Sequence, residues 1–256
     1  MPVESLGPAV GFHDVTKRFG AGAPAVDGVS LSIEPGSFVA LVGTSGSGKS
    51  TLLKTINRLV EPTTGHVTIN GEDVSRASPP ALRRSIGYVF QNVGLFPHLS
   101  VAENIALPLR LSGQRAGSRV NELLDLVELP LNVLSRLPSE LSGGQRQRVG
   151  VARALAGGPR LMLMDEPFGA LDPVTRASLG EAVRALHQRL RLTTVMVTHD
   201  MTEALLFADR ILVMREGRIV ADETPAALLA GAGGEAAQAL VAVPRRQAQQ
   251  LATLSR

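Results

Sequence analysis

Short apolar segments separated by polar stretches recur along most of the chain. Those at residues 38–42, 161–164 and 211–214 are uninterrupted apolar runs, which are typical of strands buried on both faces of a parallel sheet. Further strands are predicted where β-branched and apolar residues cluster, at residues 29–33, 66–69, 86–90 and 194–198.

Helix-start signals follow several of these segments. A capping side chain directly before a proline marks a helix N-terminus, and such pairs begin at Ser78, Asp172 and Thr224. The spacing of a capping box occurs twice, at Ser100 with Glu103 and at Asp200 with Glu203. Strands that alternate with helices predict an α/β domain with a largely parallel sheet.

The strand pattern disappears between about residues 93 and 158, where helical periodicity dominates. We therefore predict one domain over residues 1–230 with a helical subdomain inserted at about 93–158. A glycine-rich break near residue 231 separates this domain from a short tail, residues 231–256. The tail sequence VPRRQAQQLATL predicts either a frayed or surface-packed helix or an amphipathic helix with a docking role.

The composition is that of a folded globular protein, with 44% hydrophobic and 19% charged residues among 256. The formal net charge is only +3 and most basic residues are arginines, so we expect solvated surface arginines and no nucleic-acid partner. The chain has no cysteine, which excludes disulfides and thiolate metal sites.

No segment resembles a targeting or membrane-spanning sequence. The start, MPVESLGPAV, lacks the basic region and apolar core of a secretory signal. The longest uncharged window near the middle, GYVFQNVGLFPHLSVA, is too short and too polar to span a bilayer. A role at a membrane would therefore require docking on another protein that spans it.

The stretch GTSGSGKST follows a predicted strand and opens a helix, and it fits the P-loop pattern G-x-x-x-x-G-K-[ST]. Its glycines allow a tight turn in which backbone N–H groups point at phosphate oxygens, and the helix N-terminus adds positive potential. We expect Lys49 to neutralise the β- and γ-phosphates and Ser50 to bind Mg²⁺. The predicted phosphate-binding residues are Gly43, Thr44, Ser45, Gly46, Ser47, Gly48, Lys49, Ser50 and Thr51.

A pair of carboxylates follows the apolar run LMLM. Ligands of α/β proteins bind at the carboxyl edge of the sheet, which is where Asp165 and Glu166 are expected to lie. We predict that Asp165 binds Mg²⁺ and that Glu166 polarises the attacking water. A solvated turn is the other interpretation of such a pair, and the P-loop favours the catalytic one.

The stretch LSGGQ at residues 141–145, together with the P-loop, resembles the ATP-binding subunit of an ABC transporter. The other motifs of that family occur in its expected order along the chain: Gln91 matches the Q-loop, residues 169–172 the D-loop and His199 the switch histidine. Phe19 stands where the family places an aromatic residue under the adenine, although it could also be a core residue. The resemblance covers residues 10–230 and implies a P-loop NTPase cassette with a RecA-like core sheet, an antiparallel β subdomain and a helical subdomain insert.

The resemblance also implies roles for these residues. Two copies of the chain would sandwich two ATP molecules, each held by the P-loop of one copy and by LSGGQ of the other. Lys49 and His199 would contact the γ-phosphate, Glu166 would act as general base, and Gln91 would join the Mg²⁺ ligands. The remaining predicted ATP contacts are Ser142, Gly143, Gly144, Gln145 and Asp172. The arginines of RQRVGVARAL, which follows LSGGQ, are expected to lie on a solvated helix face without a catalytic role.

The segment that begins at Val93 and ends at Leu107 resembles the importer branch, in which it contacts the membrane permease subunits; a solute-binding protein would take part only indirectly. Longer phrases around it resemble the subgroup that imports quaternary amines such as glycine betaine, choline and carnitine. The predicted location is the cytoplasmic face of the plasma membrane, as a peripheral subunit. Import of amino acids or methionine, and a soluble ABC-type switch that acts on nucleic acid or the ribosome, are alternatives. The CBS domains that many members of the subgroup carry are not expected.

Overall fold

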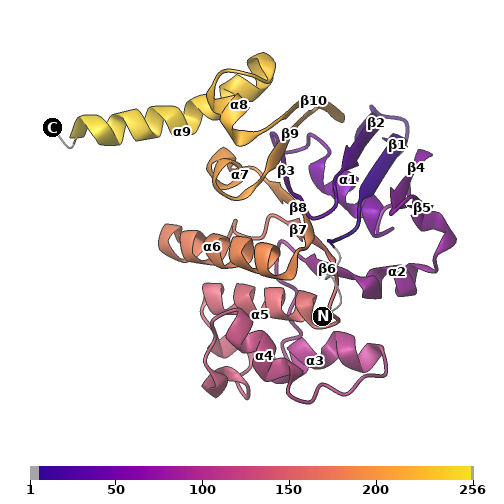
Figure 1. The fold of residues 1–256 in the computed structure, drawn as a ribbon, viewed down its shortest axis with the longest axis vertical. Helices are drawn as coiled ribbons and strands as arrows, with labels where there is room; N and C mark the ends of the chain where they lie inside the picture. The colour runs from indigo at the N-terminus through magenta and orange to yellow at the C-terminus, as the bar shows by residue number, and fades with distance from the viewer. Residues whose placement is uncertain (1–5, 255–256) are drawn as a thin grey trace.

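A six-stranded sheet lies at the centre of the fold in the computed structural model, which describes residues 6–254 (Figure 1). The strand order is β10-β9-β3-β8-β7-β6. Five of these strands run parallel, and β10 pairs with β9 in the antiparallel sense. The strands are β3 (Phe38–Val42), β6 (Ile86–Val89), β7 (Leu161–Asp165), β8 (Thr193–Thr198), β9 (Arg210–Arg215) and β10 (Arg218–Glu223).

A second, antiparallel sheet packs beside the first, in the order β2-β1-β4-β5 (Figure 1). Its strands are β1 (Val10–Lys17), β2 (Val26–Ile33), β4 (Thr64–Ile69) and β5 (Glu72–Asp73). The predicted α/β class, with a largely parallel core sheet and an antiparallel β subdomain, is therefore confirmed.

Helices connect the strands and cover the core sheet. They are α1 (Lys49–Ile56), α2 (Pro79–Ser85), α3 (Val101–Leu111), α4 (Arg119–Leu126), α5 (Gly143–Leu155), α6 (Pro173–Leu190), α7 (Met201–Phe207), α8 (Pro225–Leu229) and α9 (Gly234–Leu254). Between β6 and β7, a stretch that the structure describes in full, the chain forms only helices and loops, and α3 to α5 stack together there (Figure 1). This stretch corresponds to the segment without strand pattern at about residues 93–158.

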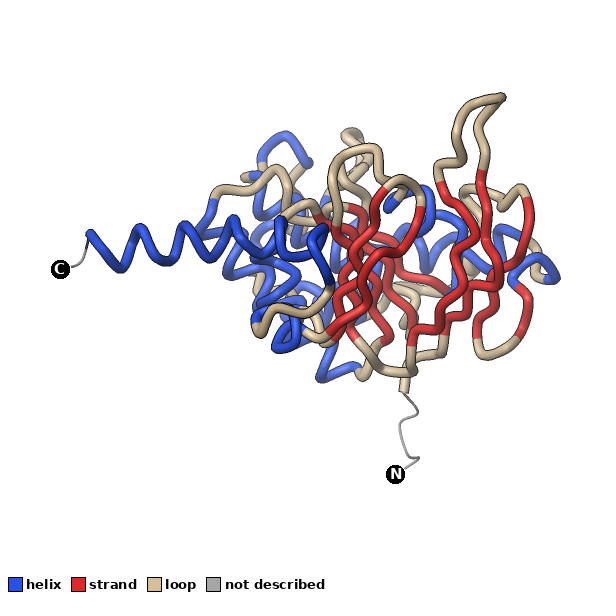
Figure 2. Tube along the Cα trace, turned by 90° about the horizontal axis from the view of Figure 1, so that it is seen from above, coloured by secondary structure: helices blue, strands red, loops and turns tan. Residues whose placement is uncertain are grey.

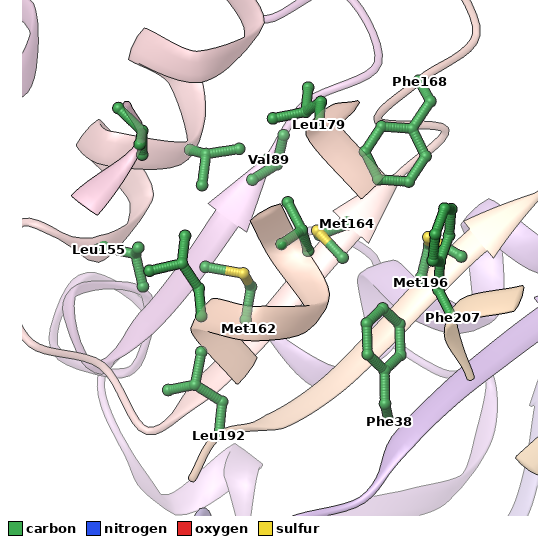
Figure 3. Close-up of a cluster of buried hydrophobic side chains, with 14 of the residues drawn as sticks. Phe38, Val89, Leu155, Met162, Met164, Phe168, Leu179, Leu192, Met196 and Phe207 are labelled. Carbon is green, nitrogen blue, oxygen red and sulfur yellow. The ribbon is translucent and has the colours of Figure 1, made fainter. Parts of the chain in front are cut away.

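Alternate residues of the core strands face two different hydrophobic clusters. On β3, Phe38 and Ala40 point into the cluster formed with the helical side, where Met162 and Met196 also lie (Figure 3). Val39 and Leu41 point to the other cluster, in which α1 and the antiparallel sheet pack. Because both faces are covered, the strands read as continuous apolar runs.

The predicted tail forms helix α9 after a turn at residues 231–233. Ala237 and Val241 in its first half are fully buried. Its second half projects beyond the body of the protein (Figures 1 and 2). The tail is thus partly a packed element of the cassette and partly a helix that projects from it.

Several sequence predictions need correction. Strands β1, β5 and β10 were not predicted. The predicted bounds of β3 are confirmed, and the other predicted strands differ from the structure by up to three residues at an end. Ser78 precedes α2 without a side-chain cap hydrogen bond. Asp200 caps α7 by accepting from the Thr202 N–H, but Glu203 does not complete a capping box, because its carboxylate accepts a hydrogen bond from Thr198 instead.

Some expectations concern the chain ends. The first residues of the predicted cassette, 1–5, and the last residues of the predicted tail, 255–256, lie outside the described residues. Part of the segment considered for a secretory signal lies there too. Within residues 6–254, no helix is both long and apolar enough to cross a membrane.

Burial of His187 is expected to make the free energy of unfolding depend on pH. His187 on α6 is 4% exposed, packs 5.2 Å from the Phe38 ring and hydrogen-bonds Thr194 at 2.9 Å. Burial, assisted by Arg184, lowers the pKa of His187 to about 4. The unfolded chain, with a histidine pKa near 6.5, therefore takes up this proton first as the pH falls. The stabilisation is complete above about pH 6.5 and is lost towards pH 4.

The expected loss from His187 between pH 7 and pH 5 is about 2 kcal/mol in the free energy of unfolding. Urea denaturation of the wild type and of His187→Gln at both pH values measures it, and the variant should lack this part of the pH dependence. His98→Gln removes an exposed histidine and is the control. An equal pH dependence in wild type and His187→Gln would contradict the assignment.

Candidate active site

The carboxyl ends of four neighbouring strands bring the predicted site residues to one edge of the core sheet. The P-loop follows β3, Glu166 follows β7, Gln91 follows β6 and His199 follows β8. Open α/β sheets bind their ligands at this edge. The order of the strands therefore assembles residues that lie more than 150 positions apart in the chain.

The P-loop depends on two of its glycines. Gly43 has a φ of 153° and Gly48 a φ of 103°, in a region that favours glycine. A Cβ atom added to Gly43 would lie 2.2 Å from the Met214 carbonyl oxygen, and one added to Gly48 would lie 2.0 Å from the Ala25 carbonyl oxygen. Helix α1 begins at Lys49, so the N–H groups of its first turn have no intrahelical acceptor and are available to an anion.

Lys49 lies at the centre of this loop and is 5% exposed. Its ammonium group donates to the carbonyl oxygens of Gly43 and Thr44, both at 2.8 Å. Burial lowers the pKa of Lys49, and the negative charges of Glu166 and Asp165 oppose that effect. The loop thus presents a buried cation together with helix-terminal N–H groups, which is suited to bind phosphate.

Asp165 is 3% exposed and is surrounded by polar groups. The Ser50 hydroxyl donates to its carboxylate at 2.6 Å and the Tyr88 hydroxyl at 3.3 Å, while the Lys54 ammonium lies 2.9 Å away. Tyr88 and Lys54 were not predicted. The spacing of Ser50 and Lys54, four residues apart on one helix, could have indicated that both side chains face the same group.

The oxygens of Ser50 and Asp165 fit a magnesium site. A hydroxyl and a carboxylate 2.6 Å apart at the P-loop are hard oxygen ligands, and Mg²⁺ is usually held by one or two such protein groups together with phosphate oxygens and water. Gln91, which was also predicted as a ligand, contacts Glu166 instead. Its role at the metal stays a prediction.

Glu166, which follows β7, contacts residues that follow the two neighbouring strands, β6 and β8. Gln91 Nε2 and His199 Nδ1 each lie 3.2 Å from Glu166 Oε2. The Glu166 backbone has a φ of 47°, an uncommon conformation for a residue other than glycine, and its N–H donates to the Val197 carbonyl at 2.9 Å. A carboxylate held between an amide and an imidazole at the edge of a phosphate-binding loop can accept a proton from water.

The signature residues lie beside the D-loop, because a Cβ atom on Gly143 would lie 3.9 Å from the Leu171 side chain. Ser142 and Gln145 form a reciprocal capping box at the start of α5. A Cβ atom on Gly144 would lie 2.3 Å from Thr175, so α6 packs closely against the first turn of α5. The start of α5 is thus a capped helix N-terminus and a second candidate anion site. The ATP contacts of the signature residues stay predictions.

Two other predicted ATP contacts have structural positions of their own. Asp172 caps α6 by accepting from the Thr175 N–H at 3.0 Å, which lowers the pKa of Asp172. Phe19 is 60% exposed, lies in the loop between β1 and β2, and has the Lys17 ammonium 5.1 Å from its ring centroid. An exposed ring agrees better with a stacking role than with a core role.

A cavity of about 450 Å³ lies beside the P-loop. It is bounded by residues 43–47, by the end of β9 and by Ala236, Ala239 and Leu240 of α9. The predicted tail therefore contributes one wall next to the candidate phosphate site. No sequence motif indicated this, because α9 and the P-loop lie almost 200 residues apart in the chain and come together only in the folded structure.

Two arginines after the signature depart from the prediction of a solvated face. Arg153 is 8% exposed, and its guanidinium donates to the carbonyls of Val93 at 2.5 Å and Gly94 at 2.7 Å. Gly150, one turn earlier, would place a Cβ atom 2.6 Å from Val93. Helix α5 thus fixes the segment that follows Gln91. Arg148 departs from it too, because its side chain is 12% exposed and its guanidinium donates to the Val127 carbonyl at 2.8 Å. Arg146 is exposed, as predicted.

These features agree with comparisons with known proteins. The model of the ABC transporter family matches residues 26–169, and the chain belongs to that family. Among curated relatives, the carnitine transport ATP-binding protein OpuCA of Listeria monocytogenes is 51% identical over 221 residues, which are 85% of this chain and 56% of that protein. The glycine betaine/carnitine/choline transport ATP-binding protein OpuCA of Bacillus subtilis is 47% identical over 226 residues, 87% of this chain and 60% of that protein.

A solved structure resembles the fold as well. The dimeric structure of an ATP-binding cassette in a post-hydrolysis state, bound to ADP and Pi, superposes with a TM-score of 0.77 at 37% identity and covers 84% of this chain and 98% of that one. The chain spans little more than half the length of the curated relatives named above. The predicted cassette fold and the resemblance to the quaternary-amine subgroup are confirmed.

Proposed function

We propose that this chain binds ATP with Mg²⁺, hydrolyses it, and powers import of a quaternary amine such as glycine betaine, choline or carnitine through a membrane permease. The observation that carries the proposal is the position of Glu166 between Gln91 and His199, at the same sheet edge as Lys49 of the P-loop. The names of the relatives support the substrate class, because they describe ATP-binding proteins for transport of these solutes.

Each residue has a distinct role in the proposed hydrolysis. Lys49 and the first N–H groups of α1 bind the β- and γ-phosphates, and Phe19 stacks on the adenine. Ser50 and Asp165 hold Mg²⁺, which when bound neutralises phosphate charge. Glu166 accepts the proton of the attacking water, and His199 contacts the γ-phosphate, where charge develops in the transition state.

A second copy of the chain completes the site in this proposal. The signature residues Ser142, Gly143 and Gly144 lie at the start of α5, where Gly143 is close to Leu171 of the D-loop. Contact across a two-fold axis would place this capped helix N-terminus on the γ-phosphate held by the partner. The dimeric state of the related cassette bound to ADP and Pi supports this arrangement.

The proposed permease site is an apolar groove of about 610 Å³ that is lined by residues of α2, β6 and α3 and of the segment between β6 and α3. Gly94, Phe96 and Leu107, all within the predicted contact segment 93–107, line it, and so does Leu111. Phe96 is 43% and Leu111 67% exposed, which is high for large apolar side chains and typical of a docking surface. An amphipathic helix of the permease fits a groove of this kind.

The groove is connected mechanically to the ATP site. The segment that lines it is held by Arg153 and Gly150 of α5, and α5 begins with the signature residues. Movement of α5 when two copies close around ATP would therefore displace the groove. Docking there places the chain on the cytoplasmic face of the membrane as a peripheral subunit.

Charge in the groove should uncouple the chain from its permease. We expect Phe96→Asp to weaken permease binding about 30-fold or more, because a desolvated aromatic anchor is worth about 2 kcal/mol at an interface. Co-purification with the permease and stimulation of ATP turnover by it measure the effect, while ATP binding stays intact. Leu131→Asp is the control, since Leu131 is 56% exposed in the same helical stretch but outside the groove. Normal coupling in Phe96→Asp would contradict the location.

Reconstitution tests the proposal as a whole. The chain is co-expressed with a permease and a solute-binding protein of the quaternary-amine class, and the assembly is placed in liposomes that contain Mg-ATP. Uptake of labelled glycine betaine, choline and carnitine is measured against histidine and methionine. ATP-dependent uptake of a quaternary amine is expected. Uptake of an amino acid alone would overturn the substrate class, and absence of ATP turnover would overturn the ATPase.

A further inference from the structure

Arg176, in the first turns of α6, contacts two segments of the candidate active site. Its Nη2 donates to the Leu171 carbonyl at 3.1 Å, within the D-loop, and its Nη1 donates to Asp200 Oδ2 at 3.3 Å. Its Nε lies 3.7 Å from Glu203 Oε1, at ion-pair distance. One guanidinium therefore joins the D-loop to the segment that follows β8.

Both neighbours of His199 in the chain are held by this network. Asp200 pairs with Arg176, and its N–H donates to Thr198 Oγ1 at 3.0 Å. Thr198 in turn donates to Glu203 Oε2 at 2.5 Å. The Glu203 side chain is 7% exposed, so its position is fixed by packing as well as by these contacts.

The His199 side chain is much less enclosed than its neighbours. It is 61% exposed, and its contact with Glu166 at 3.2 Å is with the group proposed as general base. The D-loop is close by, because a Cβ atom on Gly169 would lie 3.9 Å from His199 Cε1. The place of the imidazole therefore depends on the backbone of residues 198–200, and that backbone is held through Arg176.

We propose that Arg176 is a positioning residue that fixes His199 relative to the D-loop. The inference rests on the proposed function, in which His199 contacts the γ-phosphate and a second copy docks against the signature and D-loop. A shift of the D-loop on docking is then transmitted through the Leu171 carbonyl and Arg176 to Asp200 and His199. Lysine cannot replace this arginine fully, because one ammonium cannot present the planar fork that reaches both segments at once.

Arg184 provides a matched control on the same helix. It donates to both carboxylate oxygens of Asp209, at 2.6 and 3.1 Å, and its side chain is 27% exposed against 32% for Arg176. Both arginines thus pair α6 with a carboxylate from a later segment, but only Arg176 touches the D-loop and the neighbours of His199. Arg176→Met and Arg184→Met should lose comparable structural contacts.

Nuclear magnetic resonance of the imidazole groups tests the inference without requiring turnover. The chain has five histidines, and His199→Gln identifies the His199 signal. Arg176→Met is expected to shift or broaden that signal with and without Mg-ATP. Arg184→Met is expected to move the signal of His187, which its charge influences, and to leave His199 unchanged. An unchanged His199 signal in Arg176→Met would overturn the inference.

Kinetics provides the second measurement, on the chain with its permease. Arg176→Met is expected to lower kcat between about 2-fold and about 30-fold with KM for ATP nearly constant, and Arg176→Lys to recover part of the loss. Equal kcat in Arg176→Met and Arg184→Met would overturn the inference, whereas an inactive wild type would overturn the proposed function instead. If Arg176→Met does not fold, Asp200→Asn is measured in its place, because asparagine keeps a capping side chain at the start of α7. An unaltered His199 signal in Asp200→Asn would then overturn the inference.

Discussion

Replacing Glu166 with Gln is expected to reduce ATP turnover by about 10²- to 10⁴-fold, the usual contribution of a general base. The amide of glutamine has nearly the shape of the carboxylate and can still accept hydrogen bonds from Gln91 and His199, but it cannot take the proton of water. ATP binding should therefore remain, since the P-loop is unchanged. Phosphate release measures turnover, and a fluorescent ATP analogue measures affinity.

The same variant reports on the second copy. If hydrolysis separates the two cassettes, Glu166→Gln with Mg-ATP should accumulate as a dimer in light scattering, because the bound ligand stabilises the closed state. Glu122→Gln removes a carboxylate that pairs with Arg119 on the surface, and it should leave turnover and assembly unchanged. Undiminished turnover in Glu166→Gln would remove Glu166 from the role of base.

The residues at the sheet edge could be predicted because local pattern alone determines where they lie. Apolar runs before Gly43, Asp165 and His199 identify buried strands, and parallel strands end at a common edge. That rule is enough to bring the P-loop, the carboxylates and the histidine together. It does not give their separations, such as the 3.2 Å between His199 Nδ1 and Glu166 Oε2.

Strand β1 shows why part of the fold was missed. Its buried residues are Val10, Phe12 and Val15, so the alternation changes phase in the middle of the strand. The pairing register shifts between Phe12 and Val15, where Asp14 has a φ of 50°. A bulge of this kind disrupts the period of two on which a strand prediction depends. Strand β10 is an edge strand whose exposed residues include charges, and its pattern is similarly weak.

Contacts between distant polar side chains could not be predicted from spacing. Arg153 reaches a carbonyl 60 positions away, and Lys54 reaches a carboxylate more than 100 positions away. In the sequence each resembles an ordinary charged residue on an amphipathic helix. Their significance arises only because α5 lies against the segment after Gln91 and α1 lies beneath the carboxyl end of β7. These long-range pairs connect the site to the rest of the cassette.

Lys49→Met is expected to raise the dissociation constant for ATP by about 10- to 150-fold, equivalent to one or two charge-assisted hydrogen bonds. The loop already holds the ammonium group in a buried place, 2.8 Å from the carbonyls of Gly43 and Thr44. A phosphate therefore meets a cation that is ordered and largely desolvated. Methionine is unbranched and only one atom shorter than lysine, and it removes the charge. Equilibrium titration with a fluorescent ATP analogue, with and without Mg²⁺, measures the change.

Lys54→Met is the comparison that separates charge at the phosphates from charge at Asp165. Lys54 lies on the same helix and its ammonium is 2.9 Å from the Asp165 carboxylate. Because that carboxylate is nearly buried, loss of its partner should lower the melting temperature while ATP affinity without Mg²⁺ changes less than about threefold. Equal loss of ATP affinity in Lys49→Met and Lys54→Met would mean that general positive potential, and not the ammonium within the loop, binds the phosphates.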